Sequence, residues 1–172
     1  MNRSKTCAAL FVAILCAAAP AAADPTTTQA KPNYGFAKIK ALVGAWQGTS
    51  KDGKTVKATY TLVADGSAVM ETLEPGTESP MITMYHPDGS RVMMTHYCSA
   101  HNQPRMRAEA PAADPKTLTF SFLDATNLSS PAEGHMDRLV VSFVDPDHFA
   151  QEWTFKAKGQ TQVDTFSFQR AN

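Results

Sequence analysis

The chain has 172 residues, with 16 basic and 16 acidic side chains and therefore no net charge. It contains no block of Lys or Arg, which argues against nucleic acid and anionic membranes as partners. No run reaches the ~18 apolar residues that a membrane-spanning helix requires, and the length suits one domain with a hydrophobic core of its own.

The first residues have the order of a secretory signal. Two basic residues precede an apolar run at 7–19, and small residues follow it up to Ala23. This order predicts a signal peptide at 1–23, so the mature protein is expected to be exported, either periplasmic or secreted, with a net charge of about −2. A lipoprotein anchored through Cys16 is the alternative, but the residues before that cysteine are bulky where such processing prefers small ones.

Residues 24–33 are rich in Thr, Pro and Lys and predict a flexible leader. The remaining segment, 34–172, is predicted to form one domain. Its first apolar residues, from Phe36 to Val43, recur at helical spacing, and Gly44 ends this short helix. We expect the helix to plug one end of the structure that follows.

From residue 46 onward the hydrophobic pattern has a period of two, and turn residues recur about every ten residues. The pattern predicts ten strands, at 45–50, 55–63, 67–73, 80–86, 91–98, 104–109, 116–124, 135–144, 148–156 and 161–170. A meander of that many twisting strands closes on itself and removes its edges. The predicted fold is all-β: a ten-stranded antiparallel up-and-down β-barrel with a short N-terminal capping helix.

The segment 81–109 combines methionines and histidines with turn and strand signals. It holds five of the eight methionines and three of the five histidines of the chain. A two-residue turn at 88–89 would place Met81 opposite His96 on neighbouring strands. Strand alternation then gives Tyr85 and His96 the same, more apolar face, which we assign to the interior.

A few polar groups set in an apolar wall are typical of a small-molecule site. The predicted ligand-binding residues are His96, Tyr85, Arg105, His135, Met94 and Trp153. Arg105 would bind a ligand carboxylate through two hydrogen bonds if its face is inward, and would be solvated if it is outward. For His96 the alternative is a structural histidine whose ring is hydrogen-bonded within the protein.

Other chemistry finds less support in the sequence. His96, Cys98 and the methionines are soft ligands suited to Cu(I), but no Cys-x-x-Cys or His-x-x-x-His spacing occurs, and core-filling methionine is the favoured interpretation. Cys98, the single cysteine beyond the signal peptide, is interpreted in the same way, as a small buried hydrophobe. The chain lacks a nucleophile elbow, a phosphate loop and a zincin helix, which argues against an enzyme.

The motif Gly44-x-Trp46-x-Gly48 after a short helix, with a basic residue (Arg170) on the last strand, resembles the calycin group: lipocalins, fatty-acid-binding proteins and nitrobindin-like haem barrels. The chain from 46 to 170 also resembles a bacterial group of exported proteins of unknown function. The sequence motifs on which this resemblance rests lie at 84–86 (MYH), 95–98 (THYC), 102–106 (NQPRM), 134–136 (GHM) and 152–155 (EWTF). It implies a lipocalin-like barrel and no activity.

Nitrobindin-like barrels bind haem iron through a histidine near the end of the chain, and here no histidine follows His148. A haem would have to recruit His96, His135 or His148, so no cofactor is predicted and haem remains an alternative. The predicted function is binding of a small, largely apolar ligand with a polar end. The alternatives are a haem-binding or enzymatic barrel of the nitrobindin type, and a barrel packed solid that serves as an envelope interaction module.

Closure of the barrel predicts a contact between its first and last strands. Antiparallel pairing brings the start of one strand beside the end of the other, so Trp46 and Arg170 are expected to meet in a cation–π contact that supports the fold.

Amino-terminal sequencing of the exported protein checks the signal peptide. We expect cleavage after Ala23 and a soluble product that begins at Asp24, because the apolar run is too short to span a bilayer and small residues follow it. A lipid on Cys16 would contradict this prediction.

Overall fold

The computed structural model describes residues 32–76 and 79–171; the predicted signal peptide and residues 24–31 of the leader lie outside the described residues. In the described part there is one α-helix, α1 (Tyr34–Ala41), and a short 3-10 turn at Ala64–Gly66. The strands are β1 (Gly44–Ser50), β2 (Thr55–Val63), β3 (Ala68–Glu74), β4 (Met81–Asp88), β5 (Arg91–Tyr97), β6 (Gln103–Ala108), β7 (Thr117–Thr126), β8 (His135–Asp145), β9 (His148–Ala157) and β10 (Gln160–Arg170).

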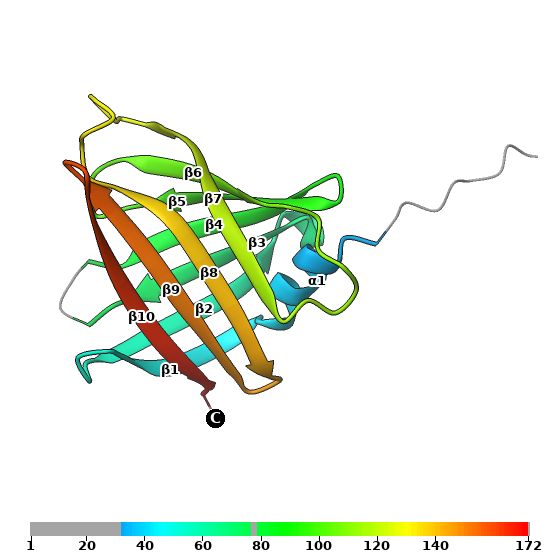
Figure 1. Ribbon diagram of the computed structural model, residues 1–172. Helices are drawn as coiled ribbons and strands as arrows, with labels where there is room; N and C mark the ends of the chain where they lie inside the picture. The colour runs from blue at the N-terminus through cyan, green and yellow to red at the C-terminus, as the bar shows by residue number, and fades with distance from the viewer. Residues whose placement is uncertain (1–31, 77–78, 172) are drawn as a thin grey trace, which may run out of the picture. The chain divides into compact units, whose positions relative to one another are not determined.

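The strands form a closed barrel (Figure 1). Each strand pairs antiparallel with its neighbours in the sequence, and β1 pairs with β10 to complete the ring. This confirms the predicted all-β, ten-stranded barrel, and each strand begins and ends within two residues of its predicted range. In the part of the chain that the structure describes, no helix has the length and apolar character needed to cross a bilayer.

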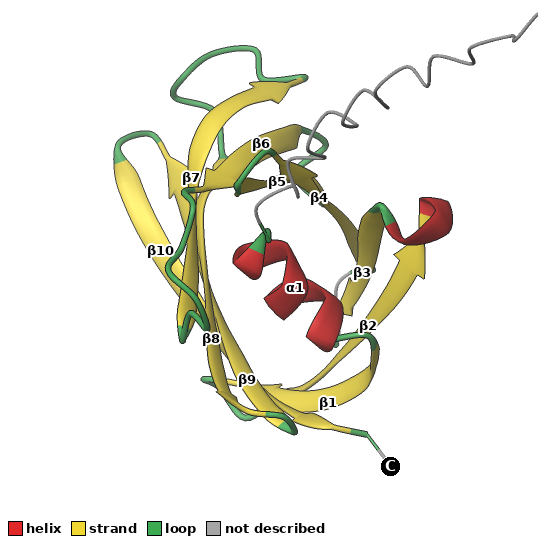
Figure 2. Cartoon of the chain, turned by 90° about the vertical axis from the view of Figure 1, so that its right-hand side faces the viewer, coloured by secondary structure: helices red, strands yellow, loops and turns green. Residues whose placement is uncertain are grey.

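Helix α1 lies in the opening at one end of the barrel (Figure 2). Asn33 caps it, since its side chain accepts a hydrogen bond from the Phe36 amide at 2.8 Å. The same side chain donates to the carbonyl oxygens of Gly89 and Arg91 at 2.9 and 2.8 Å, which ties the helix to the turn between β4 and β5. Phe36 and Ile39 are buried against the barrel core. The helix therefore plugs this end, as predicted.

The turn between β4 and β5 lies one residue later than predicted. Asp88 remains in the ladder opposite Arg91 and forms an ion pair with it at 2.9 Å, while Gly89, whose φ is +59°, opens the two-residue turn. As a result Thr83 lies opposite His96. The predicted register is wrong by two residues, and because a shift of two preserves the faces of both strands, His96 still faces the interior.

The helix end of the barrel is packed solid. The Trp46 indole Nε1 donates to the carbonyl oxygen of Leu42 at 2.7 Å, immediately after α1. Phe149 meets the Trp46 ring edge-on at 4.7 Å between centroids and the Tyr60 ring at 5.8 Å. On its other side Phe149 stacks on Phe168 at 4.7 Å. These rings fill the space between the helix and the middle of the barrel.

Trp46 and Arg170 make the contact that the sequence predicts. They are opposite one another in the β1–β10 ladder, and the guanidinium carbon lies 4.2 Å from the centre of the indole. Three backbone carbonyl oxygens hold the guanidinium in place at 3.0–3.2 Å, those of Ala41, Val43 and Pro146. Arg170 thus joins the seam of the barrel to the end of α1.

A double-mutant cycle measures this contact. Trp46→Ala should lower the free energy of unfolding by ~3–5 kcal/mol because it removes a large buried ring. Arg170→Ala should cost less, and the two changes together should show a coupling of about 0.5–2 kcal/mol in urea titrations. Lys158→Ala, in an exposed turn, is the control and should change little. Strictly additive effects would show that the contact contributes nothing.

Candidate functional site: a cavity at the open end of the barrel

A row of polar side chains crosses the apolar interior. Tyr60, Glu71, Thr83 and His96 are successive register partners on β2, β3, β4 and β5, and all four are buried. Directly opposed residues on one face of a sheet have Cβ atoms about 4.5–5.5 Å apart, so the four side chains form a continuous strip. We call these four residues the polar row.

Glu71 is the centre of the polar row and has no exposed surface. Its carboxylate accepts hydrogen bonds from the hydroxyls of Tyr60 at 2.9 Å and Tyr85 at 2.7 Å, and from the Gln151 amide at 2.6 Å. The indole of Trp153 donates to the amide oxygen of Gln151 at 3.0 Å. Because an indole nitrogen can only donate, this bond turns the NH₂ group of Gln151 toward Glu71.

Burial dominates the electrostatics of this cluster. It raises the pKa of Glu71, and hydrogen bonds from Tyr85, Gln151, Tyr60 and Thr83 oppose that rise. Burial and the nearby Glu71 charge raise the pKa of both tyrosines well above the ordinary value, so their hydroxyls remain protonated donors. Among the ion pairs of the described residues none involves Glu71. Hydrogen bonds alone therefore hold this carboxylate inside the barrel.

His96 ends the polar row at β5. Its Nδ1 is 2.9 Å from the hydroxyl oxygen of Thr83, and its ring packs on Trp153 with 4.6 Å between ring centres. The side chain is 1% exposed, and burial lowers its pKa to about 4, so the imidazole is neutral at pH 7. Its Nε2 is buried and makes no hydrogen bond with any described residue. A buried polar atom without a partner is unusual and calls for an explanation.

A cavity of about 220 Å³ lies beside His96 and is lined in part by the β1–β2 hairpin. Helix α1 lies at the other end of the barrel from this hairpin (Figure 1). Six of its twelve lining residues are apolar: Leu73, Pro75, Met81, Met136, Trp153 and Phe166. The polar rim consists of Ser50, Asp52, Lys54, Gln162 and Asp164. The interior is thus filled at the helix end and hollow at the other end.

Four of the six predicted ligand-binding residues lie in the interior, at two depths. His96 and Trp153 line the cavity. Tyr85 and Met94, which are register partners on β4 and β5, are fully buried and do not line it. Tyr85 lies below the cavity, where its hydroxyl is bound to Glu71.

The structure does not bring His135 to His96, with which it was predicted to bind a ligand. His135 packs on Phe122 at 4.7 Å, its Nδ1 lies 2.8 Å from the carbonyl oxygen of Glu133, and it lines a separate surface pocket of about 460 Å³. The reason is a register shift in β8 between Met136 and Arg138. A bulge of this kind exchanges the two faces of a strand, so Met136, rather than His135, faces the cavity.

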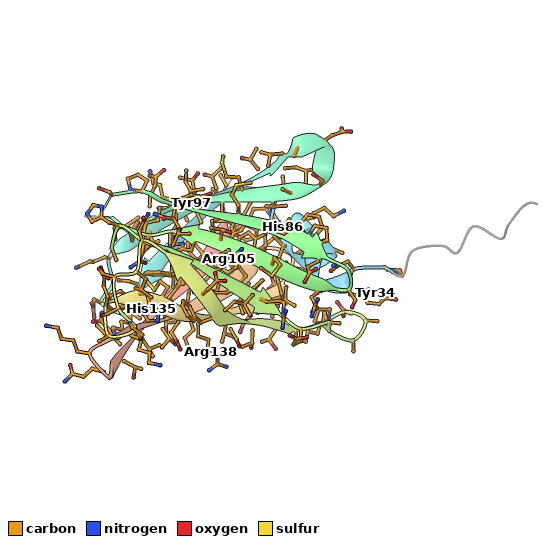
Figure 3. All side chains as sticks on the ribbon, turned by 90° about the horizontal axis from the view of Figure 1, so that it is seen from above. Tyr34, His86, Tyr97, Arg105, His135 and Arg138 are labelled. Carbon is orange, nitrogen blue, oxygen red and sulfur yellow. The ribbon has the colours of Figure 1, made fainter. Side chains whose placement is uncertain are left out.

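Arg105, predicted to bind a ligand if its face is inward, lies on the outward face. Its side chain is 52% exposed and forms an ion pair with Asp124 across β6 and β7, with 2.6 Å between Nε and Oδ1. On β6 the buried positions are those of Pro104, Met106 and Ala108, which alternate with Arg105 and put it on the outer wall. Figure 3 looks onto this wall, on which Arg105, His86 and Tyr97 are labelled.

Sequence reasoning missed Glu71, Tyr60 and Gln151 as site residues. Each lies at an inward position of a strand whose other inward residues are apolar, such as Val69 and Leu73 on either side of Glu71. A charged residue at an inward position of a strand is a signal in the sequence, because a carboxylate is buried only where other groups form hydrogen bonds or ion pairs with it.

Metal and haem binding find no suitable geometry here. Across residues 32–76 and 79–171, no group of three or more His, Cys, Asp and Glu side chains could hold a metal ion, and Cys98 packs against the core. A haem does not fit a cavity of about 220 Å³, which is below the ~300–1,000 Å³ usual for small-molecule pockets. His148, the last histidine, is exposed and lies 2.9 Å from Asp145.

Comparisons with known proteins leave the function open. No protein-family model and no curated protein matches the chain. A solved structure of a protein of unknown function from the DUF3598 family of Nostoc punctiforme is similar at 13% identity and a TM-score of 0.44 over 77% of this chain, which spans about half (49%) of that protein. The structure of EF1p2_mFAP2b bound to DFHBI is similar at 15% identity and a TM-score of 0.38, over 81% of this chain and 100% of that one.

Likenesses this distant carry no functional argument. The class of the protein follows from its own geometry: a closed, antiparallel β-barrel, plugged by a helix at one end and hollow at the other. Neither the nitrobindin-like nor the fatty-acid-binding resemblance gains support from the comparisons.

The buried carboxyl predicts a pH dependence of stability. Because burial raises the folded-state pKa of Glu71, its contribution is fully present below the unfolded pKa of about 4.3 and is lost as the pH rises through the folded pKa. Urea titrations between about pH 4 and pH 7 should show the free energy of unfolding of the wild type falling relative to that of Glu71→Gln. Glu74→Gln, at an exposed site on the same strand, is the control. Parallel profiles for wild type and Glu71→Gln would contradict the prediction.

Proposed function

We propose that the protein binds a small, largely apolar ligand with a polar end, in the cavity at the open end of the barrel. The observation that carries this proposal is a cavity of about 220 Å³, with apolar side chains beneath a polar rim, that has an unpartnered, buried polar atom, His96 Nε2, at its wall. Few polar groups set among apolar side chains are the usual composition of a ligand site. A barrel that only needed a solid core would gain stability from a larger apolar side chain at this point.

The size of the cavity limits the ligand. An apolar cavity of ~150 Å³ is large enough to bind benzene, so about 220 Å³ suits a single ring with one or two small substituents. Long acyl chains do not fit, because the rings around Trp46 and Phe149 fill the helix end of the interior. The aromatic walls of Trp153 and Phe166 favour a flat ligand.

The rim of the cavity suits a ligand that enters from water. Ser50, Asp52, Lys54, Gln162 and Asp164 surround the mouth, and the apolar residues lie beneath them. In such a site the polar rim stays in contact with water. The apolar part of the ligand leaves water when it enters the cavity, and this transfer favours binding. The proposal includes the expected export of the protein, so the ligand would be met outside the cytoplasm.

Filling the cavity should abolish binding without unfolding the barrel. Met81 lines the cavity, whereas its neighbour Ile82 lies on the outer face and is 38% exposed. We expect Met81→Trp to weaken the binding of 4-methylphenol at least tenfold in isothermal titration calorimetry, because the indole occupies the space of the ligand. Ile82→Trp should bind like the wild type and serves as the matched control.

Two results would overturn the proposal. One is equal affinity for 4-methylphenol in wild type and Met81→Trp, which would locate binding elsewhere, for example in the pocket at His135. The other is a wild-type protein that binds no single-ring compound and that, purified from its own host, shows no retained ligand by native mass spectrometry.

A further inference from the structure

We propose that the pocket between β7 and β8 is a second binding site, which takes a small ligand with an apolar body and a primary ammonium group. The inference goes beyond the proposed function, because the pocket at His135 and the cavity at His96 share no lining residue. It rests on an opening in the barrel wall and on two acceptor atoms, one on His135 and one on Asp137, that face a single donor.

The wall of the barrel opens where β7 and β8 separate. In the described part of the chain, the ladder that joins these strands ends at Ser121 and Arg138. Beyond that point β7 continues along β6 alone, and the first residues of β8 pair with β9 alone. A pocket of about 460 Å³, a usual size for a small-molecule site, lies between them and is lined by 122–125, 128–131, His135, Asp137 and Lys156.

Each of the two separating strands carries one extra residue at the pocket: Leu123 on β7 and Asp137 on β8. The residues on either side of each pair with consecutive residues of the facing strand, so these two have no ladder partner. His135 and Arg138, which flank the bulge in β8, are labelled in Figure 3. A bulge re-aims a side chain and is common beside functional sites, and both extra residues line the pocket.

His135 lines the pocket although it is only 4% exposed. Its Nδ1 lies 2.8 Å from the carbonyl oxygen of Glu133, and its ring packs on Phe122 on the other side of the opening. A carbonyl oxygen can only accept a hydrogen bond, so this contact requires the proton on Nδ1. In a neutral imidazole the other nitrogen, Nε2, then presents a lone pair.

The segment before His135 is held in place without a ligand. The Asn102 amide donates to the carbonyl oxygen of Gly134 at 2.8 Å, and the Ser129 hydroxyl donates to the Glu133 carboxylate at 2.6 Å. A Cβ atom on Gly134 would lie 2.4 Å from the Phe155 ring, so the chain passes close over that ring. A ligand therefore meets an ordered histidine, which reduces the entropy that binding would otherwise cost.

The separation of two acceptors indicates which donor fits. His135 Nε2 and Asp137 Oδ1 are 3.8 Å apart, which is too far for a hydrogen bond between them. A nitrogen atom at about 2.9 Å from each, the usual length of such a bond, can donate one hydrogen to the imidazole and one to the carboxylate. An ammonium group has three hydrogens to donate, whereas a hydroxyl has one and can serve only one of the two acceptors.

The charges at the pocket favour a cation. Asp124 is paired with Arg105, with 2.6 Å between Nε and Oδ1. Asp137 has only a loose partner, because the half-exposed Lys156 ammonium lies 3.8 Å from its Oδ1, and an exposed pair of this length contributes little. A ligand ammonium can replace that contact with a shorter one, and a ligand carboxylate would be repelled by Asp137.

The apolar part of the ligand also has a place in the pocket. Leu123, Leu128 and Pro131 line it, and Leu123 is an exposed residue of the outer wall. A ring that covers these side chains removes apolar surface from water, which favours binding. The site thus suits an arylalkyl or alkyl ammonium ion.

The test is an NMR titration of the full mature protein at pH 8 with three probes of nearly equal size: 2-phenylethylamine, 2-phenylethanol and 3-phenylpropanoate. The amide shifts of residues 122–137 report this pocket separately from the cavity at His96. We expect the amine to bind about tenfold more tightly than the alcohol, because it makes a charge-assisted hydrogen bond that the alcohol lacks. The carboxylate should bind most weakly.

Four variants locate the ammonium group. Asp137→Asn should lower the affinity for the amine about tenfold, and His135→Phe, which keeps a ring against Phe122, should lower it as well. Lys156→Gln removes the competing cation and should raise the affinity. Asp145→Asn is the control, since it changes the net charge as Asp137→Asn does but lies at the other end of β8, next to His148; it should bind like the wild type.

Several results would overturn the inference. One is equal affinity for the amine and the alcohol, and another is an amine titration that leaves the shifts of residues 122–137 unchanged. If Asp145→Asn weakens binding as much as Asp137→Asn, the amine responds to the overall charge and not to this pocket. Weaker binding by Lys156→Gln would place the ammonium group elsewhere. The proposed function stands in each case, because it depends on other residues.

Discussion

The burial of the Glu71 carboxyl is the constraint on which the rest of the interior depends. A carboxylate without a cation is costly to bury, and only a full set of donors offsets that cost. Two of its donors, the Tyr60 and Tyr85 hydroxyls, come from the strands beside it, and the third, the Gln151 amide, comes from β9 across the lumen. The network thus joins walls that are not neighbours in the sheet. It also fixes the register of β3, because a slip of one residue would turn Glu71 to the outside and leave two buried hydroxyls without their acceptor.

The barrel is built from two unequal halves with this network between them. On the helix side, α1, Trp46 and Phe149 fill the lumen, and Arg170 ties the closing seam to the end of the helix. On the other side the inward residues include methionines, whose flexible side chains adapt to different neighbours. The proposed ligand site and the seam that closes the barrel therefore lie at opposite ends, so a change at the cavity need not disturb the seam.

The sequence predicted the fold well because the fold depends on local signals. Period-two patterns and turn residues set the strand limits, and a meander of ten strands closes by geometry alone. The inward placement of His96 survived an error of two residues in the turn at Gly89. The failures arose where the pattern breaks: a bulge after Met136 exchanges the faces of β8, which moved His135 out of the site. No spacing in the sequence pairs Gln151 with Glu71, 80 positions away, so the network became visible only once the strands were in place.

The link between the two halves is a single hydroxyl. Thr83 touches the charged network through its register partner Glu71 and touches the cavity through His96. Its oxygen lies 2.9 Å from His96 Nδ1 and holds the imidazole in place, while His96 Nε2, which has no partner among the described residues, lies at the cavity. The network that holds Glu71 in the core therefore reaches, through one threonine, the polar atom on which the proposed ligand site depends.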